Sequence, residues 1–405
     1  MSGLEQAAVA SLDEARKRKR HPHAGLWAEL GLALGANDVP HANVANAMRI
    51  LRGHPDWSGK IWMDTFRGEI IGPDGVWTDV DTTKATIFMQ EACGIPKMLP
   101  QAVAPAIPVV AAEHARSSAK AWMDSLAWDG EERLDWLFSN GFGAEHTPYT
   151  AAVSKGFLIG MVARVYDPGA KVDTMPVLEG TQGDGKSTGL RKLVGDEWFA
   201  EASESPTSKD FYIAMQGKLL MEIAELDAFG RADITAVKRV ITATSDRFRA
   251  PYEKSAADHP RQCVFSATTN RDDWNRDATG ARRFLPVSCG AVFLPWIEHE
   301  REQLFAEAVH RYKAGEPWWD VPADEAKAEQ EARAEGDPWD EVVDRYLSDR
   351  DQTTVAAVLE HGIGMPSDRF TKAAEMRVGN ILRKFKWKRK QRRVDGGRAY
   401  VWERS

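Results

Sequence analysis

The chain has 405 residues, of which 43% are hydrophobic and 28% are charged, and its formal net charge is −7. This length predicts two or three domains, and the apolar content is ordinary for a globular protein. A run of about 18 apolar residues is missing, so we expect no membrane span, and the N-terminus lacks the apolar core of a secretory signal. Cys93, Cys263 and Cys289 are scattered without a CxxC pair. They argue against a disulfide framework and a zinc site, and a reducing cytoplasm fits.

The charge is distributed unevenly along the chain. Residues 366–405 contain 13 Lys and Arg against 4 Asp and Glu, a net charge of +9, which leaves −16 for the rest. A basic segment on an acidic body suggests contact with a polyanion, although a solvated helix face would give the same pattern. A charged leader over residues 1–22 contains the basic run Arg16–Arg20. This run could contact nucleic acid or belong to a disordered end.

Residues 23–150 are predicted to form an α-rich N-terminal region. His41–Leu51 has helical periodicity, and Trp62–Phe66 with Glu69–Ile71 predicts a β-hairpin. Tyr149–Tyr166 is expected to be an apolar helix. No residue constellation typical of catalysis occurs in this region.

Residues 151–325 are predicted to form the next domain, and from Pro168 short apolar segments alternate with loops and helices. Thr174–Glu179, Lys218–Ala224 and Arg261–Thr268 are the predicted strands. This alternation is typical of an α/β sheet.

A glycine-rich loop follows the first predicted strand. Residues 180–187 read GTQGDGKS, which places GxxxxGK(S/T) between a strand and a helix, as a phosphate-binding loop requires. Glycines let consecutive N–H groups face phosphate oxygens, and the helix N-terminus adds positive charge. Lys186 is predicted to contact the β- and γ-phosphates of ATP, and the Ser187 hydroxyl to bind Mg²⁺. The predicted nucleotide-binding residues are Gly180, Thr181, Gln182, Gly183, Asp184, Gly185, Lys186, Ser187 and Thr188.

Acidic residues accompany the second predicted strand. Glu225 stands at its carboxyl end, which faces the ligand in a parallel sheet, so we expect it to polarise the attacking water. Glu222 lies within the strand, where a charge needs a partner. It either helps to position Mg²⁺ through water or pairs with a basic neighbour. Asp227 is better explained as a helix N-cap or a surface residue.

Two further positions complete the predicted catalytic set of Lys186, Glu225, Asn270 and Arg283. Asn270 follows the third strand and is placed to hydrogen-bond the γ-phosphate or the lytic water, although such an Asn is also a common turn residue. Arg282 and Arg283 are paired in a loop, which suits stabilisation of phosphoryl charge from a neighbouring subunit. Exposed surface arginines are the alternative.

Six segments in chain order resemble the virulence-associated E family, which is similar to superfamily three helicases. They are Trp128–Leu134 (WDGEERL), Pro168–Lys171 (PGAK), Gly183–Ser187 (GDGKS), Glu222–Leu226 (EIAEL), Arg249–Tyr252 (RAPY) and Thr279–Phe284 (TGARRF), and the resemblance covers roughly residues 110–320. It implies an ATP-dependent DNA helicase or replication ATPase of a phage or mobile element, in the cytoplasm of a bacterial host cell. It also implies a homo-oligomer, a hexamer around DNA, with a primase or other replication proteins as possible partners.

The resemblance also implies roles for single residues. By motif match, Lys186 and Ser187 are the Walker A pair, Glu225 is the Walker B glutamate, Asn270 is the sensor asparagine and Arg283 is the arginine finger. Many relatives carry Asp before the Walker B Glu, where this chain has Ala224. Metal binding would then depend on Ser187 and waters, or on Glu222.

A DNA-contacting hairpin is implied at the position of the RAPY motif. Arg249 and Lys254 would contact the DNA backbone, and Tyr252 would stack on a base. The alternative pairs Arg249 with Asp246 or Glu253.

Residues 338–405 are predicted to form a winged-helix domain. Helices are expected over Pro338–Leu347, from a cap at Thr353, and from Asp368 to Phe385, followed by a β-hairpin over Trp387–Trp402 with its turn at Asp395–Gly397. The predicted DNA-binding residues here are Lys386, Lys388, Arg389, Lys390, Arg392 and Arg393. A winged helix can also bind a protein.

The sequence therefore predicts an α/β protein with an AAA+-like P-loop ATPase core, an α-rich N-terminal region and a C-terminal winged helix. Two other functions stay open. One is a DNA-stimulated ATPase that acts as an initiator or loader without processive unwinding. The other is a non-enzymatic DNA-binding assembly protein.

Overall fold

The computed structural model describes residues 21–36, 38–226, 231–249, 256–271, 274, 281–333, 338–394 and 397–404. The chain divides into two compact units. One comprises residues 1–271 with 280–329, and the other comprises residues 272–279 with 330–405. None of the helices in the described ranges combines the length and apolar character that a membrane span requires.

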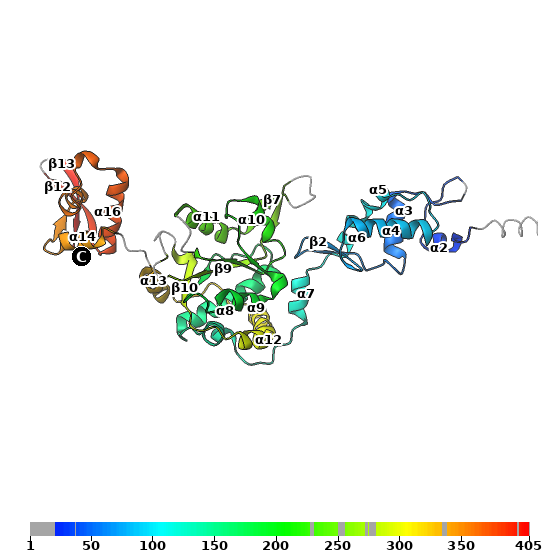
Figure 1. Cartoon of the computed structure of the whole chain (residues 1–405), viewed down its shortest axis with the longest axis horizontal. Coiled ribbons are helices and arrows are strands. Elements are labelled where there is room, and N and C mark those ends of the chain that lie inside the picture. Colours follow the sequence, from blue (N-terminus) through cyan, green and yellow to red (C-terminus); the bar gives the residue numbers. More distant parts are fainter. Residues whose placement is uncertain are drawn as a thin grey trace, which may run out of the picture. The chain divides into compact units, whose positions relative to one another are not determined.

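The first part of the larger unit has a hydrophobic core of its own. Its elements are α2 (Ala24–Glu29), α3 (Val44–Gly53), β1 (Trp62–Asp64), β2 (Glu69–Gly72), β3 (Gly75–Val76), α4 (Asp79–Glu91), α5 (Pro100–Val103) and α6 (Ala106–Glu113) (Figure 1). The helices bury Trp27, Ile50, Met89 and Ile107 against one another. β1 and β2 pair antiparallel, which confirms the predicted hairpin.

The turn of this hairpin reaches the second core of the same unit. Phe66 is buried and lies edge-on to Trp198, with ring centroids 6.5 Å apart. The Thr65 carbonyl accepts a hydrogen bond of 3.0 Å from the side chain of Gln262. Asp64 organises the turn, because its Oδ1 accepts from the backbone N–H of Phe66 and of Ser118.

The second core is built on a five-stranded parallel sheet. Its strands are β4 (Met175–Glu179), β5 (Phe199–Glu201), β6 (Leu220–Ile223), β9 (Val264–Thr269) and β10 (Phe284–Ser288), in the order β10-β4-β9-β6-β5. β4, β6 and β9 are the three predicted strands, whereas β5 and β10 were not predicted. Because all neighbours are parallel, the carboxyl ends of the strands lie at one edge.

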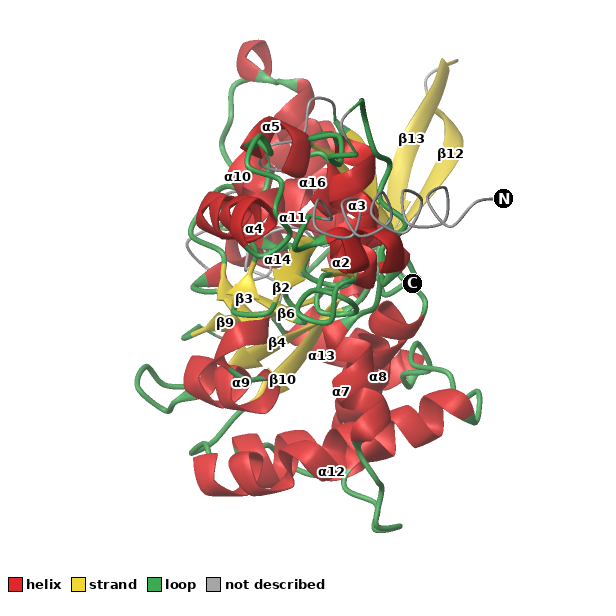
Figure 2. Ribbon diagram, turned by 90° about the vertical axis from the view of Figure 1, so that its right-hand side faces the viewer, coloured by secondary structure: helices red, strands yellow, loops and turns green. Residues whose placement is uncertain are grey.

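Helices cover both faces of this sheet. They are α7 (Ser118–Ser125), α8 (Pro148–Tyr166), α9 (Lys186–Val194), α10 (Lys209–Ala214), α11 (Arg231–Thr242) and α12 (Leu294–Lys313), with the short turns η1 (Leu134–Trp136), η2 (Leu137–Gly141), η3 (Asp196–Trp198) and η5 (Ala281–Arg283). α8, α9 and α12 lie on one face, and α10 and α11 on the other (Figures 1 and 2). β7 (Ser245–Phe248) and β8 (Ala257–Pro260) form a separate antiparallel hairpin, and α13 spans Ala323–Ala332.

The Trp128–Leu134 motif lies in the segment that precedes α8, and it connects this segment with helix α12. Fully buried Glu307 accepts hydrogen bonds of 2.6 and 2.9 Å from the backbone N–H groups of Arg133 and Leu134. Glu307 also pairs with Arg311 one turn along α12, at 2.6 Å. This motif therefore has a structural role in the described fold.

The smaller unit consists of short helices and a three-stranded sheet. Its elements are α14 (Asp340–Leu347), β11 (Gln352–Thr353), α15 (Val355–Ala357), η6 (Val358–Gly362), η7 (Ser367–Arg369), α16 (Lys372–Lys384), β12 (Lys388–Val394) and β13 (Gly397–Glu403). The sheet is antiparallel, in the order β11-β13-β12, so the predicted β-hairpin is confirmed. Val343, Val378, Leu382 and Trp402 lie in its core.

Two helix starts in this unit differ from the prediction. The cap of the second helix is Thr354 rather than Thr353, since its hydroxyl accepts from the Ala357 N–H at 3.1 Å. α16 begins at Lys372 rather than at Asp368, and Thr371 caps it. Thr354 and Thr371 both have the extended backbone that aims the hydroxyl into the first turn of the helix.

Candidate nucleotide site

The loop between β4 and α9 has the backbone of a phosphate cradle. Gly183 and Gly185 have φ angles of 93° and 88°, in the left-handed region that side chains disfavour. Gly185 is the N-cap of α9, and the helix begins at Lys186. The first amides of this helix therefore open toward the loop, where an anion would meet N–H groups and the positive end of the helix.

Lys186 is held inside the loop. Its side chain is buried, and its Nζ donates hydrogen bonds of 2.9 and 2.8 Å to the carbonyl oxygens of Gly180 and Thr181. A phosphate oxygen carries more negative charge than a carbonyl oxygen, so the ammonium group would gain from exchanging these bonds for bonds to a phosphate.

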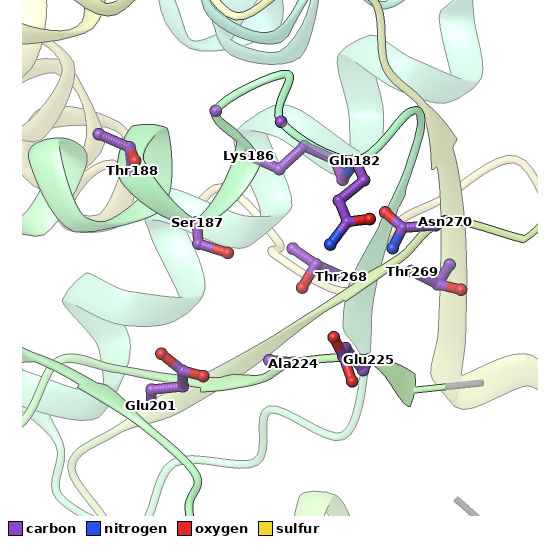
Figure 3. Close-up of a pocket in the computed structure, with 12 residues that line it drawn as sticks. Gln182, Lys186, Ser187, Thr188, Glu201, Ala224, Glu225, Thr268, Thr269 and Asn270 are labelled. Atoms are coloured by element: carbon purple, nitrogen blue, oxygen red, sulfur yellow. The ribbon is translucent and has the colours of Figure 1, made fainter. Parts of the chain in front are cut away.

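A cavity of about 370 Å³ opens between the loop and the carboxyl ends of β5, β6 and β9 (Figure 3). It is lined by Gln182, Gly183, Gly185, Lys186, Ser187, Thr188, Glu201, Ala224, Glu225, Thr268, Thr269 and Asn270. The fold thus brings most of the loop together with the predicted Glu225 and Asn270. Gly180, Thr181 and Asp184 belong to the loop but are not among the lining residues.

Glu222 lies beneath this cavity and is fully buried. Its Oε1 accepts hydrogen bonds from the hydroxyls of Ser187, at 2.6 Å, and Thr268, at 2.7 Å. Burial raises the pKa of this carboxyl group, while the two hydroxyl donors oppose the rise. Its contacts in the described part of the chain are hydroxyls, so the alternative in which Glu222 pairs with a basic neighbour is wrong.

The donor set around Ser187 fits a magnesium ion. The Oε2 atom of Glu222 is buried and has no hydrogen-bond partner among the described residues. Mg²⁺ prefers oxygen ligands and commonly takes one or two protein groups together with phosphate oxygens and water. Among the described residues, no cluster of three or more His, Cys, Asp or Glu could hold a metal ion. A magnesium ion at Ser187 would therefore need phosphate oxygens and water to complete its ligands.

Glu225 follows β6 with an unusual backbone conformation. Its φ is 50°, in the left-handed region, and its side chain is exposed. For a residue with a Cβ this conformation costs on the order of 1 kcal/mol. This conformation changes the direction of the chain after the strand. Figure 3 shows the Glu225 carboxylate at the rim of the cavity.

Arg283 lies outside the cavity of its own chain. Its Nε donates a hydrogen bond of 2.8 Å to the Thr242 hydroxyl at the end of α11, and the side chain is half-buried. Its role as an arginine finger for a neighbouring subunit stays a prediction.

The hairpin of β7 and β8 corrects one sequence alternative. Asp246 pairs with buried Arg261 in a two-bond contact and is therefore not the partner of Arg249. Arg249 is exposed and directly follows β7. The predicted DNA-contacting residues Tyr252 and Lys254 lie outside the described residues, as do Glu253 and Asp227.

The predicted basic residues of the smaller unit follow α16. Lys386, Lys388, Arg389 and Lys390 are exposed. The guanidinium of Arg389 lies 3.6 Å from the ring centroid of Tyr400, and Lys390 pairs with Glu403 at 2.8 Å. Arg392 and Arg393 belong to β12, but their side chains are outside the described part of the chain.

Sequence reasoning missed three polar residues of the site, Thr268, Thr269 and Glu201. Thr268 lies within the third predicted strand, and from the sequence a role was assigned only to Asn270, which follows that strand. Glu201 ends a strand of three residues, which is too short to show a pattern. Parallel pairing places Glu201 directly opposite Glu222.

A parallel sheet whose β4 strand leads through a glycine loop into a helix, with lysine, serine and carboxylate groups around one cavity, defines a P-loop NTPase core. The family model for the virulence-associated protein E-like domain matches residues 123–336. The match spans more than half of the chain, and the protein belongs to this family.

Similarity to solved structures extends over most of the chain, whereas no curated protein matches it. The apo structure of the NrS-1 C-terminal region is similar at 14% identity with a TM-score of 0.48, covering 85% of this chain and 96% of that chain. An A-form apo structure of the same region has 14% identity, a TM-score of 0.49 and the same coverage.

Proposed function

We propose that this protein is an ATP-dependent DNA helicase or replication ATPase of a phage or other mobile element, which hydrolyses ATP between the subunits of a ring. One observation carries the proposal: the cavity that joins the glycine loop, buried Lys186, the Ser187–Glu222 pair and the rim carboxylate Glu225. Membership of the virulence-associated protein E-like family supports the phage or mobile-element context.

The proposal gives each of these residues a task. The loop amides and Lys186 bind the β- and γ-phosphates of ATP. Glu225 holds the attacking water and accepts its proton, while Asn270 orients that water or the γ-phosphate. Ser187 and Glu222 would hold Mg²⁺, which would neutralise charge on the phosphate oxygens. Arg283 of the neighbouring subunit would stabilise the transferred phosphoryl group.

The exposed basic residues of the smaller unit support DNA as the partner. We propose that this unit is a winged helix in which α16 and the β12–β13 hairpin contact DNA. Lys372, Met376, Asn380 and Arg383 recur at helical spacing along α16, and all four are exposed. Arg383 donates a hydrogen bond of 2.6 Å to Asn380 Oδ1, which places a cation and an amide on one exposed face. Such a face suits a DNA groove.

The first prediction concerns ATP hydrolysis. The full chain should hydrolyse ATP in the presence of Mg²⁺, and single-stranded or forked DNA should stimulate it. Lys186→Ala removes the ammonium group from the cradle, and Glu225→Gln removes the base, so each should lower kcat by about 100-fold or more. A phosphate-release assay with and without DNA measures both effects, with Lys84→Gln, at an exposed lysine of α4, as the control.

A strand-release assay with a labelled forked duplex, run beside the phosphate-release assay, separates the competing functions. Hydrolysis without strand release from a labelled forked duplex would favour an initiator or loader over a helicase. Nucleotide binding without any hydrolysis, unchanged by Glu225→Gln, would favour a non-enzymatic assembly protein and contradict the proposal.

A further inference from the structure

Two exposed carboxylates line the nucleotide cavity, and only Glu225 has a task in the proposed hydrolysis. The other, Glu201, ends β5 at the position paired with Glu222. No hydrogen bond or ion pair engages the Glu201 carboxylate among the described residues. A free carboxylate at the wall of a phosphate-binding cavity calls for an explanation, because it repels the ligand that the glycine loop attracts.

The acidic groups around the cavity favour a bound cation. Of the residues that line it, Lys186 alone carries a positive charge, while Glu201 and Glu225 are acidic. Glu222 lies just beneath the cavity, and strand pairing places it directly opposite Glu201. A bound triphosphate adds several more negative charges. A divalent cation balances such a site, and the carboxylates nearest to it then become favourable.

Position 224 provides no acidic group to the cavity. Ala224 lines the cavity, but its methyl group cannot accept a hydrogen bond. In Figure 3, Ser187 and Glu201 are drawn on the left of the cavity, Ala224 lies beside Glu225 at the bottom, and Thr269 and Asn270 are on the right. Glu201 therefore lies on the side of the serine hydroxyl, away from the polar ends of β9.

We propose that Glu201 is a metal-positioning residue, which accepts hydrogen bonds from water molecules bound to the Mg²⁺ of the nucleotide complex. It supplies from the neighbouring strand the carboxylate that position 224 lacks. This inference rests on the proposed function, since it requires that the cavity takes Mg²⁺ together with ATP. Glu201 acts through water, as outer-sphere groups commonly do at magnesium sites.

The test measures binding rather than turnover. A fluorescent, non-hydrolysable ATP analogue is titrated into the full chain across a range of Mg²⁺ concentrations, and also in EDTA. Glu201→Gln keeps the shape of the side chain but removes its charge. The Mg²⁺ concentration that half-saturates binding should rise about tenfold, the usual effect of losing an outer-sphere partner. Binding in EDTA should be unchanged or tighter, because a negative charge has left the cavity wall.

Glu204→Gln provides the matched control. Glu204 is also exposed and lies three residues further on, but it does not line the cavity. This variant should bind the analogue like the unmodified protein at every Mg²⁺ concentration. Because both positions are exposed, folding should be unaffected, and equal melting temperatures check this.

A second variant tests the relation to position 224. Ala224→Asp in the Glu201→Gln background should restore most of the Mg²⁺ affinity. Electron paramagnetic resonance with Mn²⁺ and ADP gives the same information directly, since free Mn²⁺ should increase in Glu201→Gln and decrease again in the double variant. If Ala224→Asp restores nothing, Glu201 does not stand in for that position.

The outcomes separate this inference from the proposed function. If the unmodified protein binds the analogue in neither condition, the proposed function itself fails. If it binds with Mg²⁺ and Glu201→Gln keeps the same Mg²⁺ requirement, only the role of Glu201 is overturned. Equal weakening in Mg²⁺ and in EDTA would also overturn it, because the carboxylate would then act on the nucleotide or the fold.

Discussion

At the scale of single residues, Glu225 combines a carboxylate at the cavity rim with a left-handed backbone, at a φ of 50°. Glycine adopts this region freely, whereas any residue with a Cβ is strained there. A residue kept in a strained conformation at a ligand site indicates that its side chain matters more than local stability.

A pair of variants at this position measures the strain. Glu225→Ala and Glu225→Gly both remove the carboxylate, so both should abolish ATP hydrolysis. Glu225→Gly should nevertheless be more stable than Glu225→Ala by about 1 kcal/mol, despite the greater flexibility of glycine when unfolded. Urea unfolding without nucleotide measures the difference. A Gly variant less stable than the Ala variant would show that this φ carries no strain.

A site residue could be predicted when a local sequence motif specifies it, and could not when its place depends on the order of the strands. The loop residues and Glu225 were accessible from the sequence because a local motif specifies them. Glu222 was recognised as anomalous, but its partners Ser187 and Thr268 are 35 and 46 residues away in the chain. Contacts of this kind arise from strand order, which a single sequence does not display. Glu201 depends on the same order, through its pairing with Glu222.

At the scale of elements, the base of the β7–β8 hairpin is held by a buried ion pair. The side chains of Arg261 and Asp246 are 1% and 7% exposed, and Arg261 also donates to the Val240 carbonyl of α11. Arg261 thus connects the hairpin with α11. It lies just before the start of β9, and the carboxyl end of β9 lines the nucleotide cavity. The proposed DNA hairpin therefore starts from a fixed base.

The same hairpin offers a matched pair of variants. Asp246→Asn leaves Arg261 buried without a charged partner and should lower the free energy of unfolding by about 3 kcal/mol. Asp258→Asn breaks the pair with Arg247, whose side chains are 64% and 67% exposed, and should cost less than about 1 kcal/mol. Urea unfolding of both variants makes the comparison. Equal reductions in stability would mean that the Arg261 pair does not fix the hairpin.

Two strands escaped prediction for different physical reasons. β5 has three residues, so neither alternation nor length could reveal it. β10 reads FLPVS, and a proline inside an apolar run argues against a strand. Pro286 is tolerated because β10 lies at the edge of the sheet, where one side of the strand needs no ladder partner. β4, β6 and β9 were predicted because each is an apolar run bounded by polar residues.

At the scale of the whole molecule, charge is distributed unevenly along the chain. Residues 366–405 carry a net charge of +9, whereas the remaining chain carries −16. Some of the basic side chains are matched within the unit, since Lys384 pairs with Asp340 and Lys390 with Glu403. The exposed Lys388 has no such partner among the described residues, and Arg389 lies over a tyrosine ring. These two side chains remain available to phosphate groups.

The last prediction is that this charge binds DNA. Each Lys or Arg that contacts a phosphate releases a bound counterion, so affinity falls steeply with salt. The double variant Lys388→Gln with Arg389→Gln should bind a labelled forked duplex more weakly. Its slope of log K against log salt should be smaller by about 1 for each phosphate that the substituted side chains no longer neutralise. Fluorescence anisotropy between about 50 and 200 mM salt measures both quantities.

Lys84→Gln is the control for this experiment, because Lys84 is an exposed lysine of α4 that already pairs with Asp74 and Asp81. It should leave the affinity and the salt slope unchanged. Both substituted residues of the smaller unit are exposed, while its core is formed by residues such as Val378 and Trp402, so the fold should persist. An unchanged salt slope in the double variant would contradict the prediction that the smaller unit binds DNA through these residues. The unit would then bind a protein, and DNA would have to be held by the hairpin after β7.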